Sequence, residues 1–196
     1  MIVTADEVSR SFRGAVDLLH RRIEGLQSFD MTEAGFWRSF SAIWLTLPAF
    51  VIAVALERSR AGVPLGASPL IGLDGITLAV AAGQISLFLA LPLAMIGVAR
   101  RLGLGGRYVP FVIVTNWLIA IALLVLSVPA FLLVVGWAMP GHAAFFGLAF
   151  GVLLAQAHWF ATKATLQVSG GIAALIVALA GGLYAVIAGT VHTLAL

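Results

Sequence analysis

Five long apolar stretches follow an amphipathic N-terminal segment along this chain of 196 residues. Apolar runs of about 20 residues are long enough to cross the hydrocarbon core of a bilayer as α-helices. The pattern predicts an all-α polytopic membrane bundle, in which residues 1–34 form a cytoplasmic amphipathic helix and linker and residues 35–196 form a transmembrane domain. The five predicted transmembrane helices cover residues 36–56, 76–99, 108–126, 143–160 and 171–191.

The third apolar stretch, residues 108–139, contains no Asp, Glu, Lys or Arg. A straight helix of that length would measure about 48 Å, whereas the hydrocarbon core is about 30 Å thick. We therefore predict a break at Ser127-Val128-Pro129, with residues 129–139 as a bent extension along the outer leaflet. A re-entrant hairpin is the alternative.

Residues 4–26 have the spacing of an amphipathic helix, because one stripe of the predicted helix is apolar and the opposite face is basic. The apolar positions are Val8, Phe12, Ala15, Val16, Leu19, Ile23 and Leu26. The basic residues are Arg10, Arg13, Arg21 and Arg22. Such a helix typically lies at the level of anionic lipid head groups. Packing of this helix on the cytoplasmic face of its own bundle or of a partner fits equally well, and both arrangements can hold together.

Composition excludes a water-soluble globule, since 62% of the residues are hydrophobic and only 10% are charged, against about 25% charged in soluble domains. The chain has no Cys, which excludes disulfides and thiolate metal sites and fits a bacterial inner membrane.

The distribution of Lys and Arg predicts the orientation of the chain in that membrane. With five spans, the side of the N-terminus receives Arg10, Arg13, Arg21, Arg22, Arg38, Arg100, Arg101, Arg107 and Lys163, and the other side receives only Arg58 and Arg60. Positive residues are enriched in cytoplasmic segments. The N-terminus is therefore predicted to be cytoplasmic and the C-terminus periplasmic.

Small residues recur at helical spacing in the last two predicted spans. They are Gly147, Gly151 and Ala155 in the fourth span, and Gly181, Gly182, Ala185 and Gly189 in the fifth. Such faces let helix backbones approach closely in a membrane. We expect them to pack helices within the chain; the alternative is that one face binds another membrane subunit or a second copy.

Chemistry-bearing residues are few. No Asp or Glu lies well inside a predicted span, which counts against a proton- or sodium-coupled carrier. The neutral polar candidates are Gln84, Asn116, Gln156 and His158. They would either form interhelical hydrogen bonds or line a substrate or lipid cavity. The sequence contains no motif for catalysis, cofactor binding or metal binding, and nothing in it indicates nucleic-acid binding, so we predict no enzymatic activity.

One segment carries a family resemblance. Arg107-Tyr108-Val109-Pro110-Phe111, entering a span that contains Asn116-Trp117, looks like the third helix of bacterial Yip1-domain proteins. That family is similar in its cytoplasmic N-terminal segment, five closely spaced spans and outward C-terminus. The resemblance implies this fold and, from the eukaryotic members, a scaffolding role in membrane traffic.

These observations favour a scaffold or accessory subunit of a larger membrane complex. The alternative is a small transporter or lipid-handling protein. Its support is the polar set and the prolines of the first three spans, Pro48, Pro92 and Pro129, which could create hinges; Pro48 should also kink the first span. The two functions differ in whether the four polar residues meet at a cavity.

Overall fold

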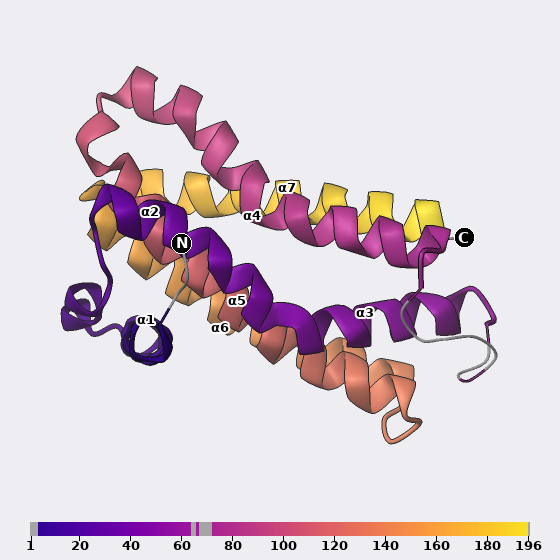
Figure 1. Cartoon of the computed structure of the whole chain (residues 1–196). Coiled ribbons are helices and arrows are strands. Elements are labelled where there is room, and N and C mark those ends of the chain that lie inside the picture. Colours follow the sequence, from indigo (N-terminus) through magenta and orange to yellow (C-terminus); the bar gives the residue numbers. More distant parts are fainter. Residues whose placement is uncertain (1–3, 64–65, 67–71, 196) are drawn as a thin grey trace.

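The computed structural model describes residues 4–63, 66 and 72–195 (Figure 1). All regular structure in these residues is helical: α1 (Ala5–Leu19), η1 (Ile23–Ser28), α2 (Glu33–Ser39), η2 (Phe40–Thr46), α3 (Leu47–Arg60), α4 (Gly75–Leu102), α5 (Gly105–Val134), α6 (Pro140–Leu166) and α7 (Gly170–Ala195). Five stretches are long and apolar enough to cross a membrane, namely Glu33–Arg60, which joins α2, η2 and α3, and the helices α4 to α7. The predicted all-α bundle with five spans is confirmed.

Helix ends follow local side-chain chemistry. Thr4, Thr32 and Asp74 precede α1, α2 and α4, and each accepts a hydrogen bond from the backbone N–H three residues later, at 3.2, 3.1 and 3.0 Å. These bonds satisfy donors that a helix start leaves unpaired. At the other end of α4, Gly103 adopts a left-handed backbone (φ 67°) that stops the helix.

The first span changes helix type before its proline. The 3₁₀ segment η2 ends at Thr46, and Pro48 lies in the first turn of α3. A proline has no N–H and its ring clashes with the carbonyl four residues earlier, which here belongs to Trp44. The distortion predicted at Pro48 therefore falls in the turns that precede it.

The third span does not break where the sequence suggested. Helix α5 continues through Ser127 and Pro129 to Val134, so both the break with a bent extension over 129–139 and the re-entrant alternative are wrong. Proline removes only one backbone donor, and membrane helices tolerate this loss; the Ser127 hydroxyl also donates to the Leu124 carbonyl at 2.7 Å. The chain turns instead at Gly136, which has a φ of 76°.

The N-terminal helix is shorter than predicted, because α1 ends at Leu19 and not near residue 26. Arg21 adopts a left-handed backbone (φ 59°), and η1 then folds back against α1. Two glycines permit this contact. A Cβ added at Gly14 would lie 2.6 Å from the carbonyl oxygen of Gly25, so any larger residue would push the two segments apart.

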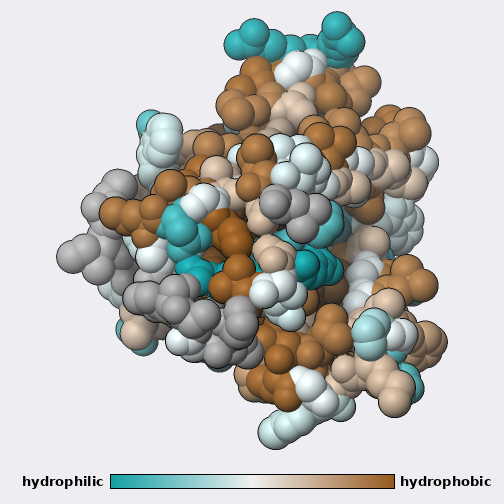
Figure 2. Space-filling model, turned by 90° about the vertical axis from the view of Figure 1, so that its right-hand side faces the viewer, coloured by the Kyte–Doolittle hydropathy of each residue, from teal (hydrophilic) through white to brown (hydrophobic). Residues whose placement is uncertain are grey.

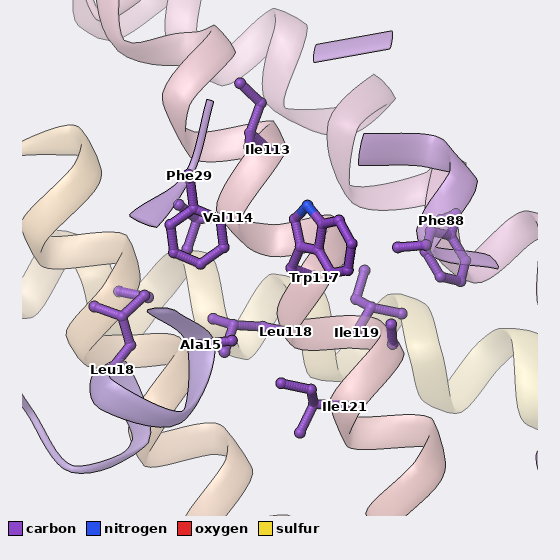
Figure 3. Packing of buried hydrophobic residues seen from close by; sticks show 13 residues of the cluster. Ala15, Leu18, Phe29, Phe88, Ile113, Val114, Trp117, Leu118, Ile119 and Ile121 are labelled. Carbon is purple, nitrogen blue, oxygen red and sulfur yellow. The ribbon is translucent and has the colours of Figure 1, made fainter. Parts of the chain in front are cut away.

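Helix α1 packs against its own bundle. It is seen end-on in Figure 1, where α5 and α6 are seen from the side, so it crosses them steeply. Ala15 and Leu18 are fully buried, and Figure 3 shows them beside Phe29 and the α5 side chains around Leu118. Arg38 adds an ionic contact through its Nε, 3.0 Å from the Glu7 carboxylate. Of the arrangements considered for this helix, the structure shows packing on its own bundle.

The long helices form two groups. Helix α7 packs along α4, while α6 packs along α5, which also contacts α3. The α6–α7 pair meets at its connection and diverges toward the other end of the bundle (Figure 1). Two cavities lie between these groups of helices.

Candidate functional site

The four predicted polar residues do not meet at one site. Gln84 of α4 donates to the Thr46 hydroxyl of η2, and Asn116 of α5 donates to the Ser39 hydroxyl at 2.9 Å. Both bonds tie a long helix to the first span, as the interhelical interpretation predicted.

Gln156 joins α6 to the N-terminal segment. With its side-chain oxygen turned toward Arg21, the amide accepts from the guanidinium Nε at 2.7 Å and from Nη2. Gln156 lies about three turns, or about 15 Å, before the end of α6. Arg21, predicted to bind lipid head groups, therefore has a protein partner.

The other predicted lipid-binding arginines have different surroundings. Arg10 and Arg13 are exposed, and Arg22 lies 3.5 Å from the carboxylate of Asp17. Their binding to anionic lipid stays a prediction.

A cavity of about 260 Å³ lies between α3, α4, α5 and α7. We call it the Glu57 cavity. Its walls are mainly aliphatic and include Ile52, Leu87 and Ile187, and Gln84 also contributes to the lining. A concave apolar space with a few polar groups is the usual form of a small-ligand site.

Ionic side chains line one end of this cavity. Glu57, whose side chain is only 10% exposed, accepts from Arg60 Nη1 at 2.6 Å through one carboxylate oxygen and lies 3.0 Å from His192 Nδ1 through the other. A buried carboxylate requires such partners. Figure 2 looks onto this end and shows hydrophilic side chains in the middle of the face, bordered by hydrophobic ones.

A second ion pair lies beside this cluster. Arg58 of α3 contacts Asp74, which caps α4. The backbone N–H of Thr77 donates to the Asp74 carboxylate at 3.0 Å, and this bond, helped by the Thr77 hydroxyl and by Arg58, holds the pKa of Asp74 below its ordinary value of 3.8. The carboxylate stays ionised and fixes the start of α4 next to the end of α3.

Sequence reasoning missed Glu57. It lies just beyond the predicted end of the first span, residues 36–56. The only local signal was the spacing of Glu57 and Arg60, which places both on one face of a helix turn.

His158 lines a different cavity of about 210 Å³ between α5, α6 and α7, which we call the His158 cavity. Tyr184 also lines it, and Leu126 borders both cavities. Neither His158 Nε2 nor the Tyr184 hydroxyl has a hydrogen-bond partner among the described residues, although both atoms are buried. Leaving such a group unsatisfied costs about 1–3 kcal/mol.

The small-residue faces do not pack within the described chain. A Cβ added at Gly147, Gly151, Gly181, Gly182 or Gly189 would meet nothing within 4 Å, and Ala155 and Ala185 are exposed. The expectation of intramolecular packing is therefore wrong, because α6 and α7 diverge where these residues lie. Gly151, Ala155 and Gly181 instead border the His158 cavity. A partner face stays a prediction.

Within the described residues, no group of three or more His, Cys, Asp or Glu side chains could hold a metal ion. No family model, no curated protein and no solved structure matches the chain. The resemblance to Yip1-domain proteins stays a prediction.

Proposed function

We propose that this integral membrane protein binds a membrane phospholipid in the Glu57 cavity. The head group would lie at Glu57, Arg60 and His192, and one acyl chain would lie between α3, α4, α5 and α7. The observation that carries the proposal is the ion-paired cluster at one end of a cavity whose other walls are mainly aliphatic.

The charges of this cluster suit a phosphate-bearing head group. A guanidinium has five N–H donors, and the Arg60 contact to Glu57 uses Nη1, so a phosphate can bind the other donors of the same side chain. The carboxylates of Glu57 and Asp74 would attract an amine. A zwitterionic head group that combines phosphate and amine, such as phosphoethanolamine, therefore fits best.

The apolar part of the cavity suits a single chain. The whole cavity has a volume of about 260 Å³, just below the range of about 300–1,000 Å³ for sites that hold drug-sized ligands. Aliphatic walls can pack against a hydrocarbon chain and shield it from polar groups, and such packing does not require one specific conformation of the chain.

The proposal also includes the orientation of the chain in the membrane and the membrane in which it lies. We place the N-terminus in the cytoplasm and the C-terminus in the periplasm of a bacterial cell, because nine of the eleven Lys and Arg residues then lie on the cytoplasmic side. The Glu57 cluster, at the opposite end of the bundle, would lie at the outer head-group level of the inner membrane.

A second candidate function is that of a scaffold or accessory subunit. Only 11% of the most apolar window of α6 and 17% of that of α7 are buried inside the chain, compared with 33–39% in the other spans. Phe145, Leu148 and Leu175 are 67–73% exposed. Surfaces of this kind contact either lipid or another membrane subunit, and a scaffold agrees with the Yip1-like expectation.

Native mass spectrometry of the purified full chain with added phosphatidylethanolamine tests the lipid proposal. Arg60→Gln, which removes the cation, and Ala53→Phe, which fills the cavity, should each weaken lipid binding at least tenfold. The matched controls are Arg101→Gln at the other end of the bundle and Ala178→Phe on an exposed face of α7, and these should bind as wild type.

Two results would favour the second candidate. One is equal lipid binding by all four variants, which would remove the site. The other is stoichiometric co-migration of the chain with a larger complex after gentle extraction from native membranes.

A further inference from the structure

The His158 cavity holds two polar atoms that the proposed phospholipid site does not use. His158 and Tyr184 both line this mainly apolar cavity, and neither His158 Nε2 nor the Tyr184 hydroxyl has a hydrogen-bond partner in the part of the chain that the structure describes. Buried polar atoms in membrane proteins are nearly always paired. Two such atoms at the same cavity point to a molecule that binds there.

We infer that the His158 cavity binds an apolar molecule that carries a carbonyl oxygen, which accepts a hydrogen bond from the Tyr184 hydroxyl. A phenol donates readily to a carbonyl, and the neutral imidazole of His158 can donate or accept at Nε2. The other lining residues named for this cavity, such as Leu118, Leu154 and Val177, offer only hydrocarbon. A molecule with a hydrocarbon body and one or two carbonyl groups matches both features.

The border of the cavity accounts for three of the small residues of α6 and α7, namely Gly151, Ala155 and Gly181. Ala155 and Gly181 lie at this border and are exposed, and a Cβ at Gly151 or Gly181 would meet no neighbour. Small side chains there keep the space between the diverging helices open. An apolar molecule can therefore enter sideways from the bilayer between α6 and α7.

Two kinds of membrane molecule share this chemistry, namely isoprenoid quinones and the ester carbonyls of acyl lipids. The site goes beyond the proposed phospholipid site, because a different set of helices forms it and Leu126 separates the two cavities. The two sites can therefore be tested independently.

The test compares three probes on the full chain in detergent, with binding followed by the quenching of tryptophan fluorescence or by competition. Decylubiquinone has ring carbonyls, methyl laurate has an ester carbonyl, and decylbenzene has a ring and chain without oxygen. Wild-type protein should bind at least one carbonyl probe saturably and at least about tenfold more tightly than decylbenzene, the difference expected from one hydrogen bond to a buried group. The tighter carbonyl probe identifies the source.

Substitutions locate the binding. Tyr184→Phe removes only the hydroxyl and should abolish the preference for carbonyl probes while leaving decylbenzene binding unchanged. Ala155→Phe should block all three probes, whereas Ala174→Phe on an exposed face of α7 should block none. A second readout is the ¹⁵N signal of His158 Nε2, which should shift when decylubiquinone is added to the wild-type chain.

Three outcomes would overturn the inference: equal binding of all three probes to wild type, no saturable binding of either carbonyl probe, or an unchanged preference in Tyr184→Phe. The comparison of the three probes on wild-type protein uses no variant, so it tests the inference even if a variant fails to fold. Arg60→Gln should leave carbonyl binding intact, which separates a failure of this site from a failure of the phospholipid site.

Discussion

Gly83 of α4 lies against Val191 of α7 with no room for a side chain. A Cβ added at Gly83 would lie 2.3 Å from the Val191 Cγ2 atom, more than an ångström inside the 3.5–4.0 Å of an ordinary carbon–carbon contact. Val191 cannot easily rotate away, because β-branched side chains in helices have one strongly preferred rotamer. Gly83→Ala must therefore push α4 and α7 apart.

The magnitude follows from two opposing effects. Overpacking of this kind destabilises by about 1–3 kcal/mol, while replacing Gly by Ala inside a helix stabilises by about 1 kcal/mol. Gly181→Ala has only the second effect, because nothing lies within 4 Å of its added Cβ. The free energy of unfolding of Gly83→Ala should thus be about 1–3 kcal/mol lower than that of Gly181→Ala.

Unfolding of the full chain in mixed micelles, followed by circular dichroism, measures this difference. The double variant Gly83→Ala with Val191→Ala removes the clash and should recover part of the loss, since the two positions are in contact. Equal stability of Gly83→Ala and Gly181→Ala would refute the assignment of Gly83 as the tight contact and of the α7 glycines as open.

Three further predictions concern α1 and the start of α4. Leu18→Ala should speed proteolysis of α1 in the full chain at least tenfold, because truncating a fully buried Leu costs about 2–5 kcal/mol; unchanged cleavage would contradict the packing of α1. Arg21→Gln should also speed this cleavage, since it loses Gln156, whereas Arg13→Gln at an exposed position should not; equal rates would refute that contact. The folded-state pKa of Asp74 lies below 3.8, so its stabilisation is present above about pH 3.8 and is lost as pH falls toward the folded value. The melting temperature of wild type should therefore fall more than that of Asp74→Asn between pH 5 and 2, and parallel curves would count against this pKa shift.

The number and type of the long helices could be predicted from sequence because they depend on local properties. The length of an apolar segment decides whether it can cross a bilayer as a helix, and this length can be read directly from the sequence. The break expected at Pro129 failed for the opposite reason. The cost of one missing donor depends on what surrounds the helix, and α5 absorbs it.

The candidate sites depend on which helices become neighbours, and the pattern of hydrophobic and polar residues along the chain does not contain that information. Glu57 and His192 are 135 residues apart in the sequence, and their contact exists only because α3 and α7 meet at one end of the bundle. Likewise, the spacing of Gly147 and Gly151 indicates that another helix could approach α6 closely at this face. It does not show whether a neighbouring helix packs there, and within the described chain none does. Among the glycines of α4 to α7, Gly83 makes the tightest contact, and it lies outside the set of small residues predicted to pack.

Photo-crosslinking tests most directly whether a lipid occupies the Glu57 cavity. Phosphatidylethanolamine with a diazirine in its acyl chain is added to the full chain in bilayers, irradiated, and the modified residues are mapped by mass spectrometry. If a lipid occupies the cavity, we expect adducts at cavity residues such as Ile52 and Ile187 that saturate with lipid concentration and disappear in Ala53→Phe. Adducts confined to exposed positions such as Leu148 and Leu175, rising without saturation and unchanged by Ala53→Phe, would contradict it.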